Sequence, residues 1–277
     1  MLRNEVDRTK LSPVMLQWMK IKDENPDAII FFRLGDFYEM FFDDAIVASK
    51  ILELTLTGKQ AGLDEKVPMC GIPFQAYEAY LDKLVEMGYK VAIVEQVEDP
   101  KLTKEMVKRE VIQIVTSGTR LDGSIDDTKN NFLASVTYTA NSYALSYADI
   151  STGEVYVTIL DDSLQELLQE IICHGFEEII VSDEIDRNFI NTLRKTYQLN
   201  VTIYNDYNDD EQYSYIYKDL NDLRKERGIK HLLAYTVNTK KGDLSHLQAA
   251  KVELINAHLL LDEHTKRNLE LTETLRL

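Results

Sequence analysis

A polar stretch near the middle of the chain most constrains how it can fold. Residues 121–131 read LDGSIDDTKNN, a composition typical of a linker between folded segments. The chain has 277 residues, whereas ordinary domains run to about 100–200 residues. The sequence therefore predicts a first domain over residues 1–120, a linker over 121–130 and a second domain that begins at residue 131.

Charge is distributed unevenly between these segments. The whole chain has a net charge of −16, which taken alone argues against a polyanionic partner such as DNA. Residues 1–120 carry 16 basic and 20 acidic groups, residues 121–220 carry 5 and 19, and residues 221–277 carry 10 and 8. Most of the acidity therefore belongs to the middle segment, and a nucleic-acid partner remains open for the first domain.

Composition predicts a globular protein inside the cell. Hydrophobic residues make up 44% of the chain and charged residues 28%, which is enough for a packed core. The longest apolar run, Ala28–Phe32, is far shorter than the roughly 20 residues of a membrane helix, and charged residues precede it from the start of the chain. Cys70 and Cys173 lack metal-site spacing and are expected to be buried free thiols. We expect a cytoplasmic protein with no membrane contact.

The first segment predicts a compact α/β domain. Ser12 and Pro13 give an N-cap and first-turn signal for a helix to about Glu24 that buries Met15, Trp18 and Met19. The further elements expected are strands over 28–32, 36–42, 67–72, 90–95 and 110–116, and helices from Asp43 toward Leu54 and over 76–87 before Gly88. Such a mixture indicates a mixed sheet with helices.

The second segment has a clearer order. Runs at 131–138, 143–149 and 154–160 predict an antiparallel meander, and a helix (163–174), strand (178–181), helix (184–197) and strand (199–204) follow. This βββαβαβ order matches a ribonuclease H-like fold. From Leu220 onward no strand pattern is visible, and apolar positions up to residues 259–261 predict C-terminal helices. The overall fold class is α/β.

Aromatic and acidic residues are concentrated between Arg33 and Ala45, in RLGDFYEMFFDDA. In a strand, Phe37 and Glu39 would share one face and Tyr38 and Met40 the other, so one face would pair an apolar side chain with a hydrogen-bond acceptor. Such alternation is also typical of an ordinary half-buried strand.

The motifs around this segment resemble the MutS family of DNA mismatch repair proteins. GDFYEMFFDDA is preceded by AIIFFRL and followed by VPMCGIPF, VAIVEQVEDP and KREVIQIVTSGT. YADISTGEV in the second segment and KRNLEL near the end extend the resemblance over nearly the whole chain. The resemblance implies a mismatch-recognition domain over 1–120, a connector domain of ribonuclease H-like fold over 131–250, and the start of a helical lever domain over 251–277.

The resemblance also implies site residues. The family's Phe-x-Glu motif falls on Phe37 and Glu39, so Phe37 is expected to stack on a mispaired or unpaired base from the minor groove while Glu39 accepts a hydrogen bond from that base. Lys66 and Met69 lie in a loop that resembles the family's loop facing the minor groove, and they are expected as secondary DNA contacts. A solvated lysine and a packed methionine are the alternative.

Two positions depart from the family's pattern. Phe74-Gln75 stands where the family commonly has Tyr-His, so an imidazole contact to phosphate does not carry over to Gln75. The family's TPGT is here Thr116-Ser117-Gly118-Thr119, which leaves the turn without the rigidity of a proline.

Two other classes of function remain open for the acidic segment. Asp149, expected at a strand centre, lies near other acids in the sequence (Glu154, Asp161, Asp162, Asp183 and Glu184), which would suit a two-metal nuclease of ribonuclease H type. Fold does not entail function, however, and Asp161, Asp162, Asp183 and Glu184 fall at expected helix starts, where capping and the helix dipole explain them. A bare protein-interaction module is the other class, whereas the resemblance implies a connector that binds the repair partner MutL.

Nucleotide chemistry is not expected within this chain. Its only Gly-Lys pair, Gly58-Lys59, is followed by Gln60, so it has no GxxxxGK[ST] phosphate loop, and no metal or cofactor is predicted for it. The resemblance implies that the chain is a fragment of a longer protein, a DNA-dependent ATPase that uses ATP and Mg²⁺. That protein would be a homodimer in the cytoplasm, associated with the nucleoid. The fragment itself is expected not to be an enzyme.

Overall fold

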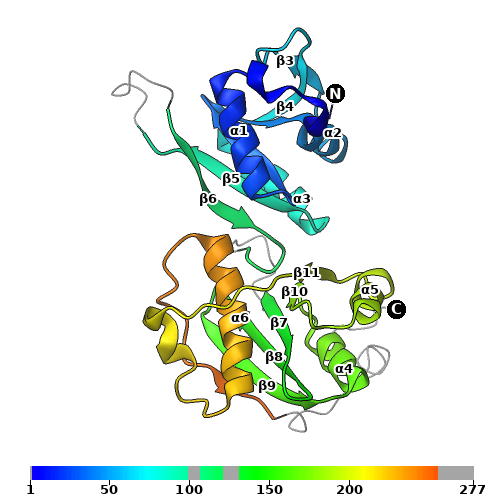
Figure 1. Ribbon diagram of the computed structural model, residues 1–277, viewed down its shortest axis with the longest axis vertical. Coiled ribbons are helices and arrows are strands. Elements are labelled where there is room, and N and C mark those ends of the chain that lie inside the picture. Colours follow the sequence, from blue (N-terminus) through cyan, green and yellow to red (C-terminus); the bar gives the residue numbers. More distant parts are fainter. Residues whose placement is uncertain (1, 99–106, 121–130, 255–277) are drawn as a thin grey trace, which may run out of the picture. The chain divides into compact units, whose positions relative to one another are not determined.

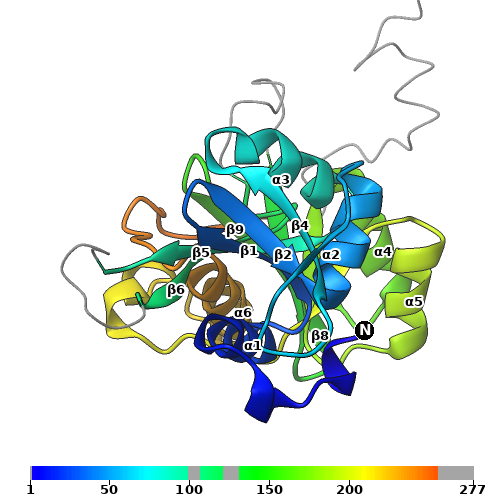
Figure 2. The same ribbon diagram turned by 90° about the horizontal axis from the view of Figure 1, so that it is seen from above.

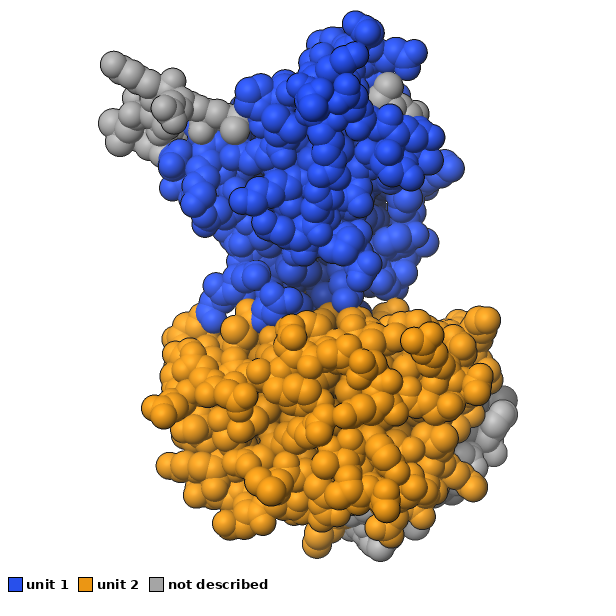
Figure 3. All heavy atoms as spheres, in the orientation of Figure 1, with its two compact units in different colours: residues 1–117, 238–242 blue, residues 118–237, 243–277 orange. Residues whose placement is uncertain are grey.

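The chain divides into two compact units (Figure 3), and the computed structural model describes residues 2–98, 107–120 and 131–254. The first unit comprises residues 1–117 with 238–242, and the second comprises 118–237 with 243–277. The expected linker over 121–130 and most of the expected lever segment lie outside the described residues. Both stay predictions.

The first unit contains one six-stranded mixed sheet (Figure 1). Its strands are β1 (Ala28–Leu34), β2 (Phe37–Phe41), β3 (Thr57–Lys59), β4 (Val67–Pro73), β5 (Lys90–Gln96) and β6 (Arg109–Val115). Its helices are α1 (Pro13–Glu24), α2 (Phe42–Ile51) and α3 (Tyr77–Glu86), with short 3₁₀ turns η1 (Arg3–Glu5), η2 (Arg8–Lys10) and η3 (Phe74–Ala76). The strand order is β3-β4-β2-β1-β5-β6, in which β1 and β5 are parallel and the other pairs antiparallel.

Helices cover both faces of this sheet, with α1 on one side and α3 on the other (Figure 2). Ser12 and Pro13 begin α1 as predicted, and Met15, Trp18 and Met19 are buried. Trp18 packs edge-on against Phe41 of β2, with ring centroids 5.8 Å apart. The face of β2 that carries Phe41 therefore faces α1, and the opposite face packs against α2 and α3.

A buried ion pair ties α1 to α2. Lys22 Nζ lies 2.8 Å from Asp44 Oδ1 and donates to the Ala28 carbonyl at 2.6 Å, while Asp44 Oδ2 accepts from the Ile30 amide at 3.0 Å. These bonds satisfy both buried charges, which is the condition under which such a pair is tolerated in a core. They hold the start of β1 against both helices.

The second unit contains another six-stranded mixed sheet, with helices α4 (Leu164–His174), α5 (Arg187–Lys195) and α6 (Leu223–Lys240) and the 3₁₀ turn η4 (Glu211–Ile216) (Figure 1). Its strands are β7 (Phe132–Tyr138), β8 (Ser142–Asp149), β9 (Glu154–Asp161), β10 (Glu178–Val181), β11 (Asn200–Ile203) and β12 (Lys251–Val252). The order is β11-β10-β7-β8-β9-β12. The meander β7-β8-β9 is antiparallel, whereas β10, β11 and β12 each pair in parallel.

Two clusters of apolar residues cover the two faces of this second sheet. One packs α4 and α5 against the sheet, and the other packs α6 and η4 against its opposite face. Between Ser163 at the N-cap of α4 and Gly175 in a left-handed conformation at its C-cap, the helix has the boundaries that its sequence predicts. None of the described helices is long and apolar enough to cross a membrane.

The mixed α/β fold class is confirmed, and so is the βββαβαβ order on which the ribonuclease H-like expectation depended. Three expectations are wrong in detail. Asp149 is the last residue of β8 rather than its centre, β12 follows α6 where only helices were expected, and Cys173 is partly exposed. Cys70 is buried, and burial raises the pKa of its thiol to about 12, so it stays protonated. The apolar positions at 259–261 lie outside the described residues.

Candidate nucleic-acid interface

A tight hairpin turn presents Phe37 at the edge of the first unit. Leu34 of β1 pairs with Phe37 of β2, so only Gly35 and Asp36 connect the two strands. Gly35 has φ +57°, a left-handed conformation that glycine adopts without steric cost. The turn therefore fixes where β2 begins and which way its first side chain points.

Phe37 is 48% exposed, although the residues that follow it, Tyr38 and Met40, are buried. Alternation along β2 places Phe37, Glu39 and Phe41 on one face. Phe41 is fully buried against α1, so this face runs from the core out to an exposed aromatic tip. Most of β2 thus packs as an ordinary half-buried strand does, but Phe37 is exposed.

Glu39 is held between solvent and core, with a side chain that is 15% exposed. Its Oε2 forms an ion pair with Lys59 Nζ from the edge strand β3. Directly opposite Glu39 on β4 is Gly71, which has no side chain to cover it. The carboxylate is therefore partly accessible and is held on one side by Lys59.

A second set of contacts holds the hairpin from the other face of the sheet. Arg33 Nε donates to the Gly35 carbonyl at 2.6 Å, and its guanidinium lies 3.4 Å from the centre of the Phe74 ring. The Phe74 amide donates to the Asp36 carbonyl at 2.9 Å. The backbone carbonyls of both turn residues therefore accept hydrogen bonds, which limits the conformational freedom of the neighbouring Phe37.

Glu95 of β5 completes this second set. It accepts a hydrogen bond from the Tyr38 hydroxyl and lies 3.6 Å from Arg33 Nη1. Burial, together with the Glu95 carboxylate, raises the pKa of Tyr38, so its hydroxyl stays a donor. The contacts under the hairpin therefore keep one hydrogen-bonding pattern over the physiological pH range.

The two secondary residues differ in their surroundings. Lys66 is exposed, and its aliphatic stem lies over Gly58, where an added Cβ would come within 2.9 Å of Lys66 Cβ. Met69 is partly buried against the core shared with α1, and its Sδ lies 3.7 Å from the Thr57 hydroxyl. Lys66 is free to contact a ligand, whereas the position of Met69 matches the alternative of a packed methionine.

Sequence reasoning missed Arg33 and Lys59 as parts of this site. Lys59 was considered only as part of a Gly-Lys pair, and the structure places it in β3 beside Glu39 rather than in a phosphate loop. Arg33 lies two residues before the Gly35 turn, and that spacing was the available signal. Gln75, at one of the departures from the family's pattern, is exposed.

In the second unit, the carboxylate of Asp149 serves the β8–β9 turn. Asp149 is 2% exposed, and its Oδ1 accepts from the Ser151 amide at 2.8 Å, the Ser151 hydroxyl at 2.6 Å and the Thr152 amide at 3.2 Å. An Asx-type turn of this kind accounts for a buried aspartate without a metal ion. The arrangement gives the nuclease hypothesis no support at its main residue.

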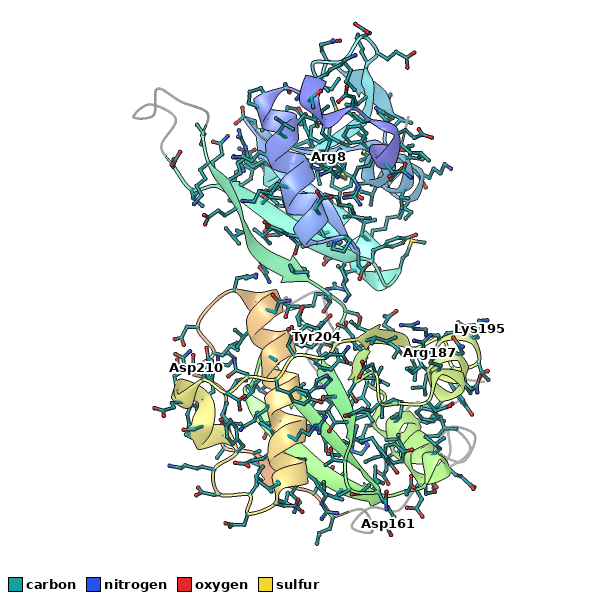
Figure 4. All side chains as sticks on the ribbon, viewed as in Figure 1. Arg8, Asp161, Arg187, Lys195, Tyr204 and Asp210 are labelled. Atoms are coloured by element: carbon teal, nitrogen blue, oxygen red, sulfur yellow. The ribbon has the colours of Figure 1, made fainter. Side chains whose placement is uncertain are left out.

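The other acids of the second unit are spread out. Asp161 at the end of β9 and Asp210 at the N-cap of η4 lie at separate places (Figure 4). Glu154 pairs with Lys251 at 3.0 Å, and Glu184 pairs with Arg227 at 2.7 Å. Within residues 2–98, 107–120 and 131–254, no group of three or more His, Cys, Asp or Glu side chains is placed to hold a metal ion.

Comparison with known proteins gives two family matches. The model of MutS domain I matches residues 12–124, and that of MutS domain II matches residues 131–248. The DNA mismatch repair protein MutS of Bacillus thuringiensis (strain Al Hakam) is 42% identical over 270 residues, which is 97% of this chain and 30% of the relative. The same values hold for the protein of that name from Bacillus cereus (strain B4264). The chain thus spans 30% of the length of these curated relatives.

Proposed function

This chain belongs to the MutS family, and we propose that it recognises mispaired or unpaired bases in double-stranded DNA as part of mismatch repair. The observation that carries the proposal is the pairing of an exposed phenyl ring and a carboxylate on one face of β2. Phe37 is 48% exposed at the tip of a braced hairpin, with Glu39 two residues along the same strand. The first unit is accordingly the DNA-reading unit.

Phe37 acts as a wedge at the minor groove in this proposal. An apolar side chain inserted between base steps must offset an unstacking cost of a few kcal/mol, and the insertion kinks the duplex. A mispaired step is easier to kink, so the protein reads deformability rather than sequence. Because every base has a π-face, one phenyl ring serves many different mispairs.

Glu39 supplies the hydrogen-bond acceptor for the displaced base. A carboxylate close to phosphates is repelled, and on a paired duplex no displaced base offers a hydrogen bond that compensates for this. Glu39 thereby penalises binding to homoduplex and favours the mispair. Its partly exposed position two residues from Phe37 supports this role.

The contacts beneath the hairpin supply preorganisation. Arg33 holds the Gly35 carbonyl and stacks on Phe74, and the Phe74 amide holds the Asp36 carbonyl. Phe37 then loses little further freedom when it inserts, which lowers the entropic cost of binding. Lys66, which is exposed just before β4, is proposed as a phosphate contact, and Met69 as a support for β3 and β4.

Replacing Phe37 by alanine tests the proposal. In the protein at its natural length, we expect Phe37→Ala to lower the affinity for a duplex with one mispair by about 10- to 100-fold, since base–aromatic stacking is worth ~1–3 kcal/mol. The affinity for the matched homoduplex should change little. Fluorescence anisotropy with labelled duplexes measures both.

The exposed aromatic Tyr89 provides the matched control. Tyr89 is 36% exposed and lies just before β5, away from the hairpin tip in sequence, so Tyr89→Ala should leave the preference unchanged. Circular dichroism should show that both variants keep their fold. Retained discrimination by a folded Phe37→Ala protein would refute the proposed function.

The wider activity of the longer relatives is also a proposal for this protein. We propose that the second unit docks the repair partner MutL, and that the whole protein is a cytoplasmic homodimer with ATPase activity. The Gly58-Lys59 pair does not form a phosphate loop, because it lies in β3 and Lys59 is engaged by Glu39. We propose that ATP and Mg²⁺ bind outside this part of the protein.

A further inference from the structure

Lys59 contacts the proposed reading residue from a different strand. It is the last residue of β3, the edge strand of the first sheet, and its ammonium group pairs with Glu39 Oε2. The same ammonium group lies 5.7 Å from the centre of the Phe41 ring. Two contacts from two positions of β2 therefore fix the end of a side chain that is otherwise long and flexible.

The pair engages only one of the two carboxylate oxygens. Within the described part of the chain, no residue donates to Glu39 Oε1. Gly71, opposite Glu39, has no side chain, and even an added Cβ would stand 3.6 Å from Glu39 Cγ. One oxygen is thus held by Lys59, and the other is left for a donor that comes from outside the protein.

Charge gives the pair a second consequence. The carboxylate lies two residues from the proposed wedge, where it would meet a duplex that carries one negative charge per phosphate. The Lys59 ammonium group offsets that charge locally while leaving the acceptor in place. Without it, Glu39 would be both more repelled and free to change rotamer.

The geometry points to Lys59 as the positioning residue that orients the Glu39 carboxylate toward a mispaired base and offsets its charge. This inference rests on the proposed function. Lys59 acts through Glu39 and need not touch DNA. Two other roles make different predictions: a phosphate contact made by Lys59 itself, and a purely structural tie between β3 and β2.

Four variants of the protein at its natural length separate these roles: Lys59→Met, Lys59→Arg, Glu39→Gln and the double variant Lys59→Met/Glu39→Gln. The readout is the ratio of affinities for a mispaired duplex and the matched homoduplex, measured at several salt concentrations. Lys50→Met is the control, since Lys50 is an exposed lysine in the last turn of α2 and gives the same change of charge.

We expect Lys59→Met to lower this ratio roughly five- to tenfold, which corresponds to the net contribution of one ordinary hydrogen bond, because Lys59 acts on the base only through Glu39. Lys59→Arg should keep most of the ratio, and Lys50→Met all of it. In the Glu39→Gln background, adding Lys59→Met should change the ratio by less than about twofold, because residues that act as one unit are not additive.

A phosphate contact would give a different pattern. Lys59→Met would then weaken binding to both duplexes equally and reduce the salt slope by about 1, whether or not Glu39 is present. A purely structural tie would lower the thermal unfolding midpoint and leave the ratio unchanged. Either pattern overturns the inference, and so does a Lys59→Met effect that persists undiminished in the double variant.

Failure of the inference is distinguishable from failure of the proposed function. If Phe37→Ala loses discrimination while Lys59→Met keeps it, the wedge stands and the positioning role of Lys59 is wrong. If Phe37→Ala keeps discrimination, the proposed function is wrong whatever Lys59→Met does.

Discussion

His231, in α6, is a histidine held in its neutral form. Its side chain is fully buried, its Nε2 lies 2.7 Å from the Tyr204 carbonyl, and its Nδ1 lies 2.7 Å from the Ser135 hydroxyl. The carbonyl can only accept, so Nε2 carries the proton and Nδ1 accepts from Ser135. One imidazole thus links β7, α6 and the residue after β11.

This histidine should make stability depend on pH. Burial lowers the pKa of His231 below 6.5, so the unfolded chain binds a proton that the folded chain does not. The contribution of neutral His231 to the free energy of unfolding is fully present above about pH 6.5. It is lost as the pH falls toward the pKa of His231 in the folded chain, by up to ~1.4 kcal/mol per pH unit. Urea unfolding at pH 7.5 and at lower pH measures this loss of stability.

The matched replacement is His231→Gln, in which the loss of stability below about pH 6.5 should be smaller, although the variant is less stable at every pH. A loss that is equally steep in His231→Gln would show that other groups cause it.

For single residues, the sequence could predict which side chains of a strand share a face, because side chains alternate along a strand. Phe37, Glu39 and the burial of Tyr38 and Met40 follow from the period of a strand that begins after Gly35. The ion pair between Glu39 and Lys59 does not follow from any local pattern. It depends on β3 pairing with β4 and on the missing side chain at Gly71, which are features of the assembled sheet.

Among the elements, α6 packs unusually closely on the second sheet. A Cβ built on Gly228 would stand 2.5 Å from Ser146 Oγ and 3.1 Å from Ala144 Cβ, both on β8. Ser146 is fully buried, and its hydroxyl has no hydrogen-bond partner in the described residues. The glycine thus permits the close contact, despite a cost to the helix of ~1 kcal/mol relative to alanine.

Gly228→Ala should therefore destabilise the protein, by ~1–3 kcal/mol from overpacking, although alanine favours helices. Ser146→Ala should be close to neutral, because it removes a buried hydroxyl that has no partner. In the double variant, Ser146→Ala should recover a large part of the stability that Gly228→Ala loses. Urea unfolding of the parent, the two single variants and the double variant measures this. A stabilised Gly228→Ala variant, or strict additivity in the cycle, would contradict this packing.

Sequence predicted the longer elements because each carries its own periodic pattern and boundary signals. α1 after Ser12-Pro13 and α4 between Ser163 and Gly175 are examples. β3 and β12 escaped prediction because they are edge strands of three and two residues, too short for a pattern. Their conformation comes from partners far away in the chain, as β12 pairs with β9 about a hundred residues earlier.

The net charge of the whole molecule indicates which part can contact DNA only when the charge is assigned to segments of the chain. Residues 121–220 carry 19 acidic and 5 basic groups, whereas residues 1–120, with Phe37 and Glu39, carry 20 and 16. In the second unit, exposed acids such as Asp161, Glu166 and Glu211 face solvent. Like charges repel, so this acidic surface disfavours contact with DNA and would leave the second unit open for a protein partner in the proposed function.

Neutralising part of this charge should change DNA affinity without changing mismatch preference. In a triple variant, Asp161→Asn/Glu166→Gln/Glu211→Gln, repulsion of phosphates falls, so affinities for mispaired and matched duplexes should rise by the same factor of about two to five at low salt. The gain should shrink as salt increases, because screening already weakens the repulsion. Titrations of both duplexes at 50 and 200 mM salt, concentrations at which such electrostatic effects differ widely, measure the two affinities. A changed ratio between the duplexes would mean that the second unit takes part in reading the mispair, contrary to the assignment of that reading to Phe37 and Glu39.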